Sequence, residues 1–141
     1  MPEDYNLPSD YELAINSWGN SFYKMYPEMK YNAAKSKCES DGTLLAVPRS
    51  KEENKFIADL KKTDQLWIGV NDLDEENKFI TVEGNPVSYT NWLDGEPNNS
   101  NNEDGVELNW GKHGYWNDQK ITKRNPFVCL YRIPGTSKIM I

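Results

Sequence analysis

The sequence predicts an α+β domain with two helices early in the chain, short antiparallel strands and a long loop that carries the functional residues. Apolar side chains recur at helical spacing in two segments, 27–41 and 50–60, which predicts the helices. Residues 66–70 form a nearly continuous apolar run, which is typical of a buried strand. Residues 88–115 show little periodicity, and so long an irregular stretch in a compact domain is usually functional or disordered.

Length and composition fit one domain with a core of its own. The chain has 141 residues, 37% of them hydrophobic, and no apolar run approaches the roughly 20 residues of a membrane span. No apolar core of a signal peptide is present, so we expect a mature chain or one that begins after a removed signal. With a net charge of -6 and no basic cluster, the sequence argues against nucleic acid and favours cations and neutral ligands.

The first third of the chain is predicted to hold a tail, a strand and a helix. Residues 1–20 are predicted to be a tail with a mobile start and the first strand, and the bulky residues 21–25 continue as strand. Pro27 fits the first turn of a helix that ends at Asp41-Gly42. Apolar residues of this helix recur at i, i+3 and i+7, namely Tyr31, Ala34 and Cys38.

A second helix is predicted to begin at Ser50. Ser50 and Glu53 have the pattern of a capping box, in which each side chain bonds the other residue's free backbone amide. The predicted buried stripe of this helix consists of Phe56, Ile57 and Leu60. The predicted strands that follow are 66–70, 79–82, 115–117 and 127–131, with a turn at 83–86.

The chain has two cysteines, Cys38 and Cys129, and their number alone leaves two alternatives open. They can be two buried thiols of an intracellular protein, or one disulfide of a secreted protein. Cys38 lies at the end of the first predicted helix and Cys129 in the last predicted strand. A bridge would therefore join the two ends of the domain.

Carboxylates and side-chain amides are concentrated between residues 92 and 118. This stretch contains Glu96-Pro97-Asn98, then Glu103-Asp104, then Trp116-Asn117-Asp118. Such side chains offer only hard oxygens, and hard oxygens favour calcium over transition metals. A solvated surface loop and a disordered linker are the alternatives, and the tryptophans that punctuate the stretch argue against the linker.

Two of these triplets, Glu96-Pro97-Asn98 and Trp116-Asn117-Asp118, resemble the signature motifs of C-type lectin carbohydrate-recognition domains. Three further segments resemble the same family in the same order, namely Gly42–Val47, Trp67–Val70 and Phe127–Cys129. The resemblance extends over roughly Ser21 to Arg132, most of the chain. It implies a C-type lectin-like fold with a carbohydrate-recognition domain at 21–132 and a C-terminal tail at 133–141.

The resemblance also implies a calcium site that holds a sugar. Its metal ligands, which are also the sugar-binding residues, would be Glu96, Asn98, Glu103, Asn117 and Asp118. It implies a disulfide between Cys38 and Cys129 and a cis peptide before Pro97. Glu-Pro-Asn implies mannose, glucose or fucose as the sugar class, and not galactose. It implies a secreted protein of innate immunity that recognises neutral glycans on glycoproteins or microbial surfaces and can form oligomers.

The resemblance also implies an auxiliary cation site, and it shows that a second disulfide common in the family is absent from this chain. The auxiliary site would use Asp72, Glu76, Asn99, Glu103 and Asp104, with Asn99 where the family usually has Asp. Residues 72–83 also imitate an EF-hand loop, but Asn77 stands where that loop requires glycine. Most members carry a second disulfide, whose positions fall on Gly105 and Ile121 here.

Two other functions compete with calcium-dependent sugar binding. One is a protein-binding or ice-binding adhesive module of the same fold, and the other is a hydrolase that uses Glu96 and Glu103. We expect no enzyme, because carboxylates that ligate a metal cannot also act freely as acid and base. His113 is expected in a turn and Trp67, Trp92 and Trp116 in the core, whereas Trp110 fits the core or the edge of the sugar site.

Overall fold

The computed structural model describes residues 12–16, 19–98 and 103–132, and it confirms the predicted α+β class. Two helices and eight strands follow one another in these ranges. In chain order they are β1 (Glu12–Asn16), β2 (Gly19–Met29), α1 (Tyr31–Ser40), β3 (Leu44–Leu45), α2 (Lys51–Asp59), β4 (Leu66–Asn71), β5 (Ile80–Thr81), β6 (Gly105–Leu108), β7 (Trp116–Gln119) and β8 (Asn125–Arg132). Within these ranges no helix is both long and apolar enough to cross a bilayer.

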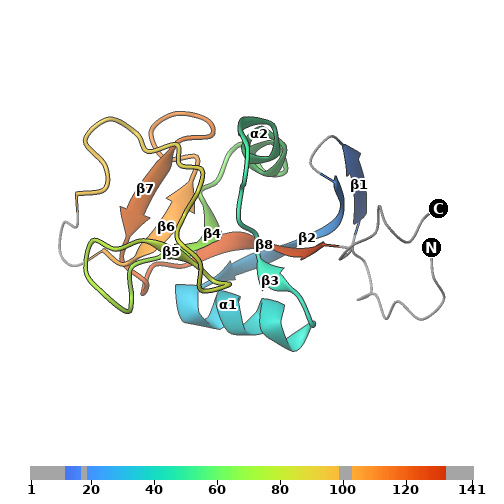
Figure 1. The fold of residues 1–141 in the computed structure, drawn as a ribbon, viewed down its shortest axis with the longest axis horizontal. Helices are drawn as coiled ribbons and strands as arrows, with labels where there is room; N and C mark the ends of the chain where they lie inside the picture. The colour runs from blue at the N-terminus through green and yellow to red at the C-terminus, as the bar shows by residue number, and fades with distance from the viewer. Residues whose placement is uncertain (1–11, 17–18, 99–102, 133–141) are drawn as a thin grey trace.

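The strands form one sheet whose main path is β1-β2-β8-β4-β6-β7. β3 pairs with β8 and β5 with β4, beside that path. All pairs are antiparallel except β4 with β8, which meet in parallel at Trp67 and Phe127. In Figure 1, α1 lies below the sheet and α2 above it, with the β1–β2 hairpin at one end and β6 and β7 at the other.

Two apolar clusters fill the spaces between the sheet and the helices. One includes Ile57 of α2 together with Ile68, Leu108 and Trp116 of the sheet, all fully buried. The other contains the three predicted positions of α1 with Leu45, Trp67, Phe127 and Cys129. The disulfide between Cys38 and Cys129, with an S–S distance of 2.06 Å, lies in this second cluster and confirms the pairing.

Pro27 was expected in a helix, and that expectation is wrong. Residues 19–29 form β2, and α1 begins at Tyr31. The pairing of β2 with β8 shifts register between Tyr26 and Met29. Pro27 lies within this irregularity, where a strand tolerates a residue without a backbone N–H.

The start of α2 confirms one half of the predicted capping box. The hydroxyl of Ser50 accepts a hydrogen bond from the backbone N of Glu53 at 3.1 Å. The carboxylate of Glu53, however, accepts from the backbone N of Arg49 at 3.1 Å and is fully buried. In the predicted stripe Ile57 is buried, while Phe56 and Leu60 are only partly buried.

The stretch 88–115 is less irregular than expected, because residues 105–108 form β6 between β4 and β7. All four residues of β6 are buried. Glu107 interrupts its apolar pattern, so the sequence does not reveal a strand there. The strand predicted at 79–82 is shorter in the structure, where β5 contains only Ile80 and Thr81.

Candidate functional site

The segment that carries Glu96 is attached to the free edge of β7. The backbone N of Leu93 donates to the carbonyl of Trp116 at 3.0 Å, and the N of Trp116 donates to the carbonyl of Asn91 at 2.9 Å. The peptide between Glu96 and Pro97 is cis, as predicted. These bonds bring the first sequence triplet beside the second, although they lie 20 residues apart.

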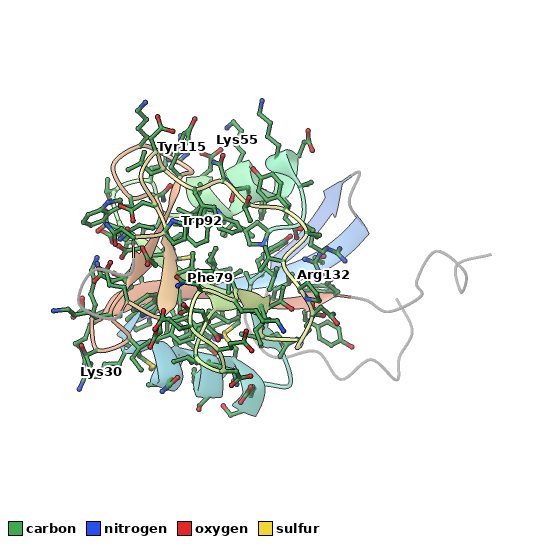
Figure 2. The ribbon with its side chains drawn as sticks, turned by 60° about the vertical axis from the view of Figure 1, so that its left-hand side comes forward. Lys30, Lys55, Phe79, Trp92, Tyr115 and Arg132 are labelled. Atoms are coloured by element: carbon green, nitrogen blue, oxygen red, sulfur yellow. A yellow bond between two sulfur atoms is a disulfide. The ribbon has the colours of Figure 1, made fainter. Side chains whose placement is uncertain are left out.

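Three aromatic rings, one of them on this segment, pack together beside β7. The Trp92 ring centroid lies 5.0 Å from that of Phe79 and 5.6 Å from that of Trp116, both in edge-on contact. Figure 2 shows Phe79 and Trp92 together in the middle of the molecule. Trp116 is fully buried and donates its indole N–H to Asn54 of α2 at 2.8 Å. Trp116 lies in the core as expected, and Trp92 is partly buried against it.

Glu96, Asn98 and Asp118 meet in direct contact at this edge. The backbone N of Asn98 donates to Oδ1 of Asp118 at 3.1 Å, and its Nδ2 lies 3.4 Å from Oε2 of Glu96. Asp118 is fully buried. Oε1 of Glu96 is also buried and has no hydrogen-bond partner among the described residues.

Charge at this edge is predominantly negative. Burial, followed by the neighbouring carboxylates of Asp118 and Glu103, raises the pKa of Glu96 to about 7 from its ordinary 4.5. A buried carboxylate oxygen that faces other carboxylates is better suited to bind a cation than to accept a hydrogen bond. Several carboxylates can share one divalent ion, which offsets their mutual repulsion. The atoms available to coordinate a metal here are all oxygens, so these residues fit calcium.

Asn117, another predicted ligand, contacts a residue outside the predicted set. The register of β6 and β7 places Asn117 opposite Glu107 and Asp118 opposite Val106. Since successive side chains of a strand point to opposite faces, Asn117 and Asp118 begin on opposite sides of β7. Nδ2 of Asn117 donates to Oε2 of Glu107 at 2.8 Å, so one of the two amide protons assigned to a sugar is already used.

The predicted auxiliary site is partly assembled in the structure. One carboxylate oxygen each from Asp72, Glu76 and Asp104 lies within 4.8 Å of the others. Burial, with further contributions from Glu76 and Asp104, raises the pKa of Asp72 to about 7 from 3.8. The Oδ1 atoms of Asp72 and Asp104 are buried with no hydrogen-bond partner in the described parts of the chain. Asn99, also predicted here, lies outside the described residues.

Glu107 is the site residue that the sequence prediction missed. It is fully buried, and it accepts four hydrogen bonds from side chains of β7, β8 and the turn between these strands. The donors to Oε2 are Asn117 at 2.8 Å and Gln119 at 3.1 Å, and the donors to Oε1 are Lys123 at 2.7 Å and Asn125 at 3.0 Å. Its only signal in the sequence is a lone acidic residue between Val106 and Leu108.

The structure also places the other residues singled out in the sequence. Trp110 is partly buried, with the amine of Lys123 5.4 Å from its ring centroid. His113 is exposed in a turn, as expected, with Nε2 2.6 Å from a carboxylate oxygen of Asp59. Gly105 and Ile121, where the second disulfide would lie, are both close to Tyr31: an added Cβ on Gly105 would lie 3.0 Å from the Tyr31 ring, and the backbone N of Tyr31 donates to the carbonyl of Ile121 at 3.0 Å.

The sequence is similar to those of known lectins. Residues 27–131 match the Lectin C-type domain family. The chain is 39% identical over 95 residues to the mannose-binding protein of Gallus gallus, covering 67% of this chain and 37% of the relative. It is 31% identical over 120 residues to lectin BRA-3 of Megabalanus rosa, covering 83% and 74%.

Solved structures share the fold along nearly their whole length. The lectin CEL-I of Cucumaria echinata is 26% identical with a TM-score of 0.78, covering 89% of this chain and 97% of that one. The carbohydrate-recognition domain of a mouse scavenger receptor is 26% identical with a TM-score of 0.76, covering 86% and 95%. Herring type II antifreeze protein, at 23% identity and a TM-score of 0.78 over 89% and 98%, is similar in fold.

Proposed function

This chain belongs to the C-type lectin domain family, and from that membership we propose that it binds carbohydrate through a calcium ion at the edge of β7. The proposed metal ligands are Glu96, Asn98, Glu103, Asn117 and Asp118. The observation that carries the proposal is the buried Oε1 of Glu96, which lacks a donor among the described residues and lies in the field of two other carboxylates. Domains of this family are binding modules and not enzymes, so the hydrolase alternative is set aside.

The residues around the proposed ion are suited to hold sugar hydroxyls. When bound, calcium would coordinate two neighbouring hydroxyls of one sugar. Each such hydroxyl keeps a proton to give and a lone pair to fill. Nδ2 of Asn98 donates to Oε2 of Glu96 at 3.4 Å, so the second amide proton of Asn98 and a further lone pair of Glu96 would offer a donor and an acceptor side by side for one hydroxyl. The carboxylate of Glu103 and the second amide proton of Asn117 are assigned to the other.

Mannose, glucose or fucose is the proposed sugar class. With one acceptor and one donor at each hydroxyl, the arrangement suits two equatorial neighbours such as those at positions 3 and 4 of mannose. The relative named mannose-binding protein supports this assignment, although the chain spans only 37% of its length. Reversing donor and acceptor with the double change Glu96→Gln and Asn98→Asp should shift preference towards galactose. Competition by free mannose and galactose measures the shift, and an unchanged preference contradicts the assignment.

The proposed setting is extracellular. The disulfide between Cys38 and Cys129 supports an oxidising compartment. Neutral glycans of glycoproteins or microbial surfaces are the proposed partners, and multivalent presentation in an oligomer would raise the avidity of a weak site.

The fold similarity to antifreeze proteins carries no argument for ice binding, and calcium-insensitive binding of a protein partner would favour the adhesive alternative.

The decisive experiment measures mannose binding with and without calcium. Wild-type protein should be retained on immobilised mannose in calcium and released by a chelator. Asp118→Asn should abolish retention, because it removes a buried charge from the proposed ligand set. Asp94→Asn is the matched control, since Asp94 is an exposed acid on the same segment, and it should bind as wild type does. Retention that survives the chelator would refute the proposal.

A further inference from the structure

A buried carboxylate behind the proposed calcium site needs an explanation that the site itself does not give. Glu107 lies in the middle of β6, directly opposite Asn117 of β7, and is fully buried. Burying a charge in a sheet is costly unless every lone pair finds a donor. Lys123 and Asn125 satisfy one oxygen of Glu107, and Asn117 and Gln119 satisfy the other.

The contact at Asn117 fixes which end of its amide points towards Glu107. The oxygen and NH2 ends of an asparagine are nearly equal in shape, so a neighbour decides their orientation. A carboxylate only accepts, so Glu107 holds the NH2 end, with Nδ2 2.8 Å from Oε2. The carbonyl oxygen of Asn117 is therefore turned away from Glu107.

This orientation matters because calcium binds oxygen and not an NH2 group. At the proposed site Asn117 would share the ion with Glu96, Glu103 and Asp118, and without metal the negative charges of these carboxylates would favour the opposite orientation, with the NH2 end towards them. We propose that Glu107 is a positioning residue, which prevents this reversal and presents the carbonyl oxygen of Asn117 to the metal. The inference rests on the proposed calcium site and assigns a role to a residue outside its ligand set.

Glu107 cannot easily turn to release Asn117. Its Oε1 accepts from the amine of Lys123 at 2.7 Å and from the amide of Asn125 at 3.0 Å, and both are donors. Glu107→Gln therefore has a defined outcome. The carbonyl oxygen of the new amide must face Lys123 and Asn125, so its NH2 group faces both Asn117 and Gln119, which donate to that oxygen in the wild type. Asn117 then turns its own oxygen towards that NH2 group and its NH2 end towards the calcium site.

Titration calorimetry with the full-length chain measures calcium affinity and so tests the role of Glu107. Glu107→Gln should weaken calcium binding by about 10- to 100-fold, which is typical when a partner that orients a ligand is changed. The double variant Glu107→Gln with Asn117→Asp should restore the affinity to within a few-fold of wild type. An aspartate has oxygen at both ends, so one oxygen can accept from the glutamine and the other can face the metal.

Two further measurements separate positioning from general stability. Glu53→Gln is the matched control, because Glu53 is equally buried and hydrogen-bonded but contacts other elements, and it should leave calcium affinity unchanged. In chelator, the NMR signals of the Asn117 side-chain NH2 should be protected from exchange in wild type and should lose protection in Glu107→Gln. That readout needs neither metal nor sugar.

Each result has a clear consequence. Wild-type calcium affinity in Glu107→Gln, or no recovery in the double variant, would overturn the inference and leave the proposed lectin function intact. An Asn117 NH2 group that exchanges freely in wild type would also overturn it. A wild-type protein that binds no calcium would refute the proposed function first, and the positioning role with it.

Discussion

At the residue scale, Glu53 shows how a second buried carboxylate is used for the fold. It accepts from the hydroxyl of Tyr23 at 2.8 Å and from the backbone N of Arg49 at 3.1 Å. The guanidinium of Arg132 pairs with the same carboxylate at 3.0 Å. Because Tyr23 lies in β2 and Arg132 in β8, one side chain joins α2 to two strands that are distant in the sequence.

Removing this carboxylate should be costly. Glu53→Ala takes from the Tyr23 hydroxyl and the Arg132 guanidinium the carboxylate that they share, and leaves Arg132 the carbonyl of Val47 at 3.0 Å. Breaking a buried ion pair costs about 3–5 kcal/mol of the free energy of unfolding. Urea denaturation measures the loss. Glu52→Ala is the control, because Glu52 is exposed in the same helical turn and should cost at most about 1 kcal/mol. Equal losses in the two variants would contradict the role given to Glu53.

At the element scale, β4 is packed so closely between its neighbours that only glycine fits at position 69. The backbone N of Gly69 donates to Ala46 at 2.7 Å, and its carbonyl accepts from Val82 at 2.9 Å. A Cβ on Gly69 would lie 2.4 Å from the carbonyl oxygen of Leu45 and 2.8 Å from Cγ2 of Val47. The first of these atoms belongs to the backbone and cannot move aside by a rotamer change.

Gly69→Ala should therefore destabilise the fold strongly. Overpacking of a core costs about 1–3 kcal/mol and more where backbone must shift, and we expect a loss above 3 kcal/mol. Gly84→Ala is the comparison, because Gly84 has a φ of +88° but no atom within 4 Å of an added Cβ. It should cost only the backbone strain of about 1–2 kcal/mol. Chemical denaturation ranks the two variants, and the reverse order would contradict the close packing of β4.

At the scale of the whole molecule, two carboxylate clusters couple folding to protons and calcium. In the metal-free protein the pKa of Glu96 and that of Asp72 are each raised to about 7, from ordinary values of 4.5 and 3.8. Between those ordinary values and about 7, the folded chain holds protons that the unfolded chain has lost. The stabilisation from these protons is complete at the acid end of this window and is lost as pH rises through about 7.

The stability of the metal-free protein should accordingly fall between about pH 4 and pH 7, the window set by the ordinary and the raised pKa values of those two groups, and should level off above it. Calcium should reverse the trend, because its ligands must be deprotonated and it binds the folded chain. Thermal unfolding in chelator and in about 10 mM calcium measures both, since extracellular calcium modules bind near 10⁻⁴–10⁻³ M. The expected rise in Tm with calcium is larger at pH 8 than at pH 5, and equal shifts at the two pH values would contradict the linkage.

The sequence by itself predicted the two helices, most of the main strands and a candidate set of metal ligands. The spacing of Tyr31, Ala34 and Cys38 predicted the buried face of α1, because helical periodicity is a local property. The order of the motifs, with Glu96-Pro97-Asn98 before Trp116-Asn117-Asp118, indicated the family and the candidate ligands. The hydroxyl of Ser50 caps α2 as predicted, since a cap involves residues only three positions apart.

Only the tertiary structure decided the features that depend on partners distant in the sequence. Pro27 lies in β2 because β8, about 100 residues later, pairs with that segment, and β6 exists because β4 and β7 flank it. The orientation of the Asn117 amide depends on Glu107, whose charge is buried only because Lys123 and Asn125 reach it. Local patterns specify which groups a chain carries, whereas burial and pairing are set by packing across the fold, and these fix the direction in which each group points.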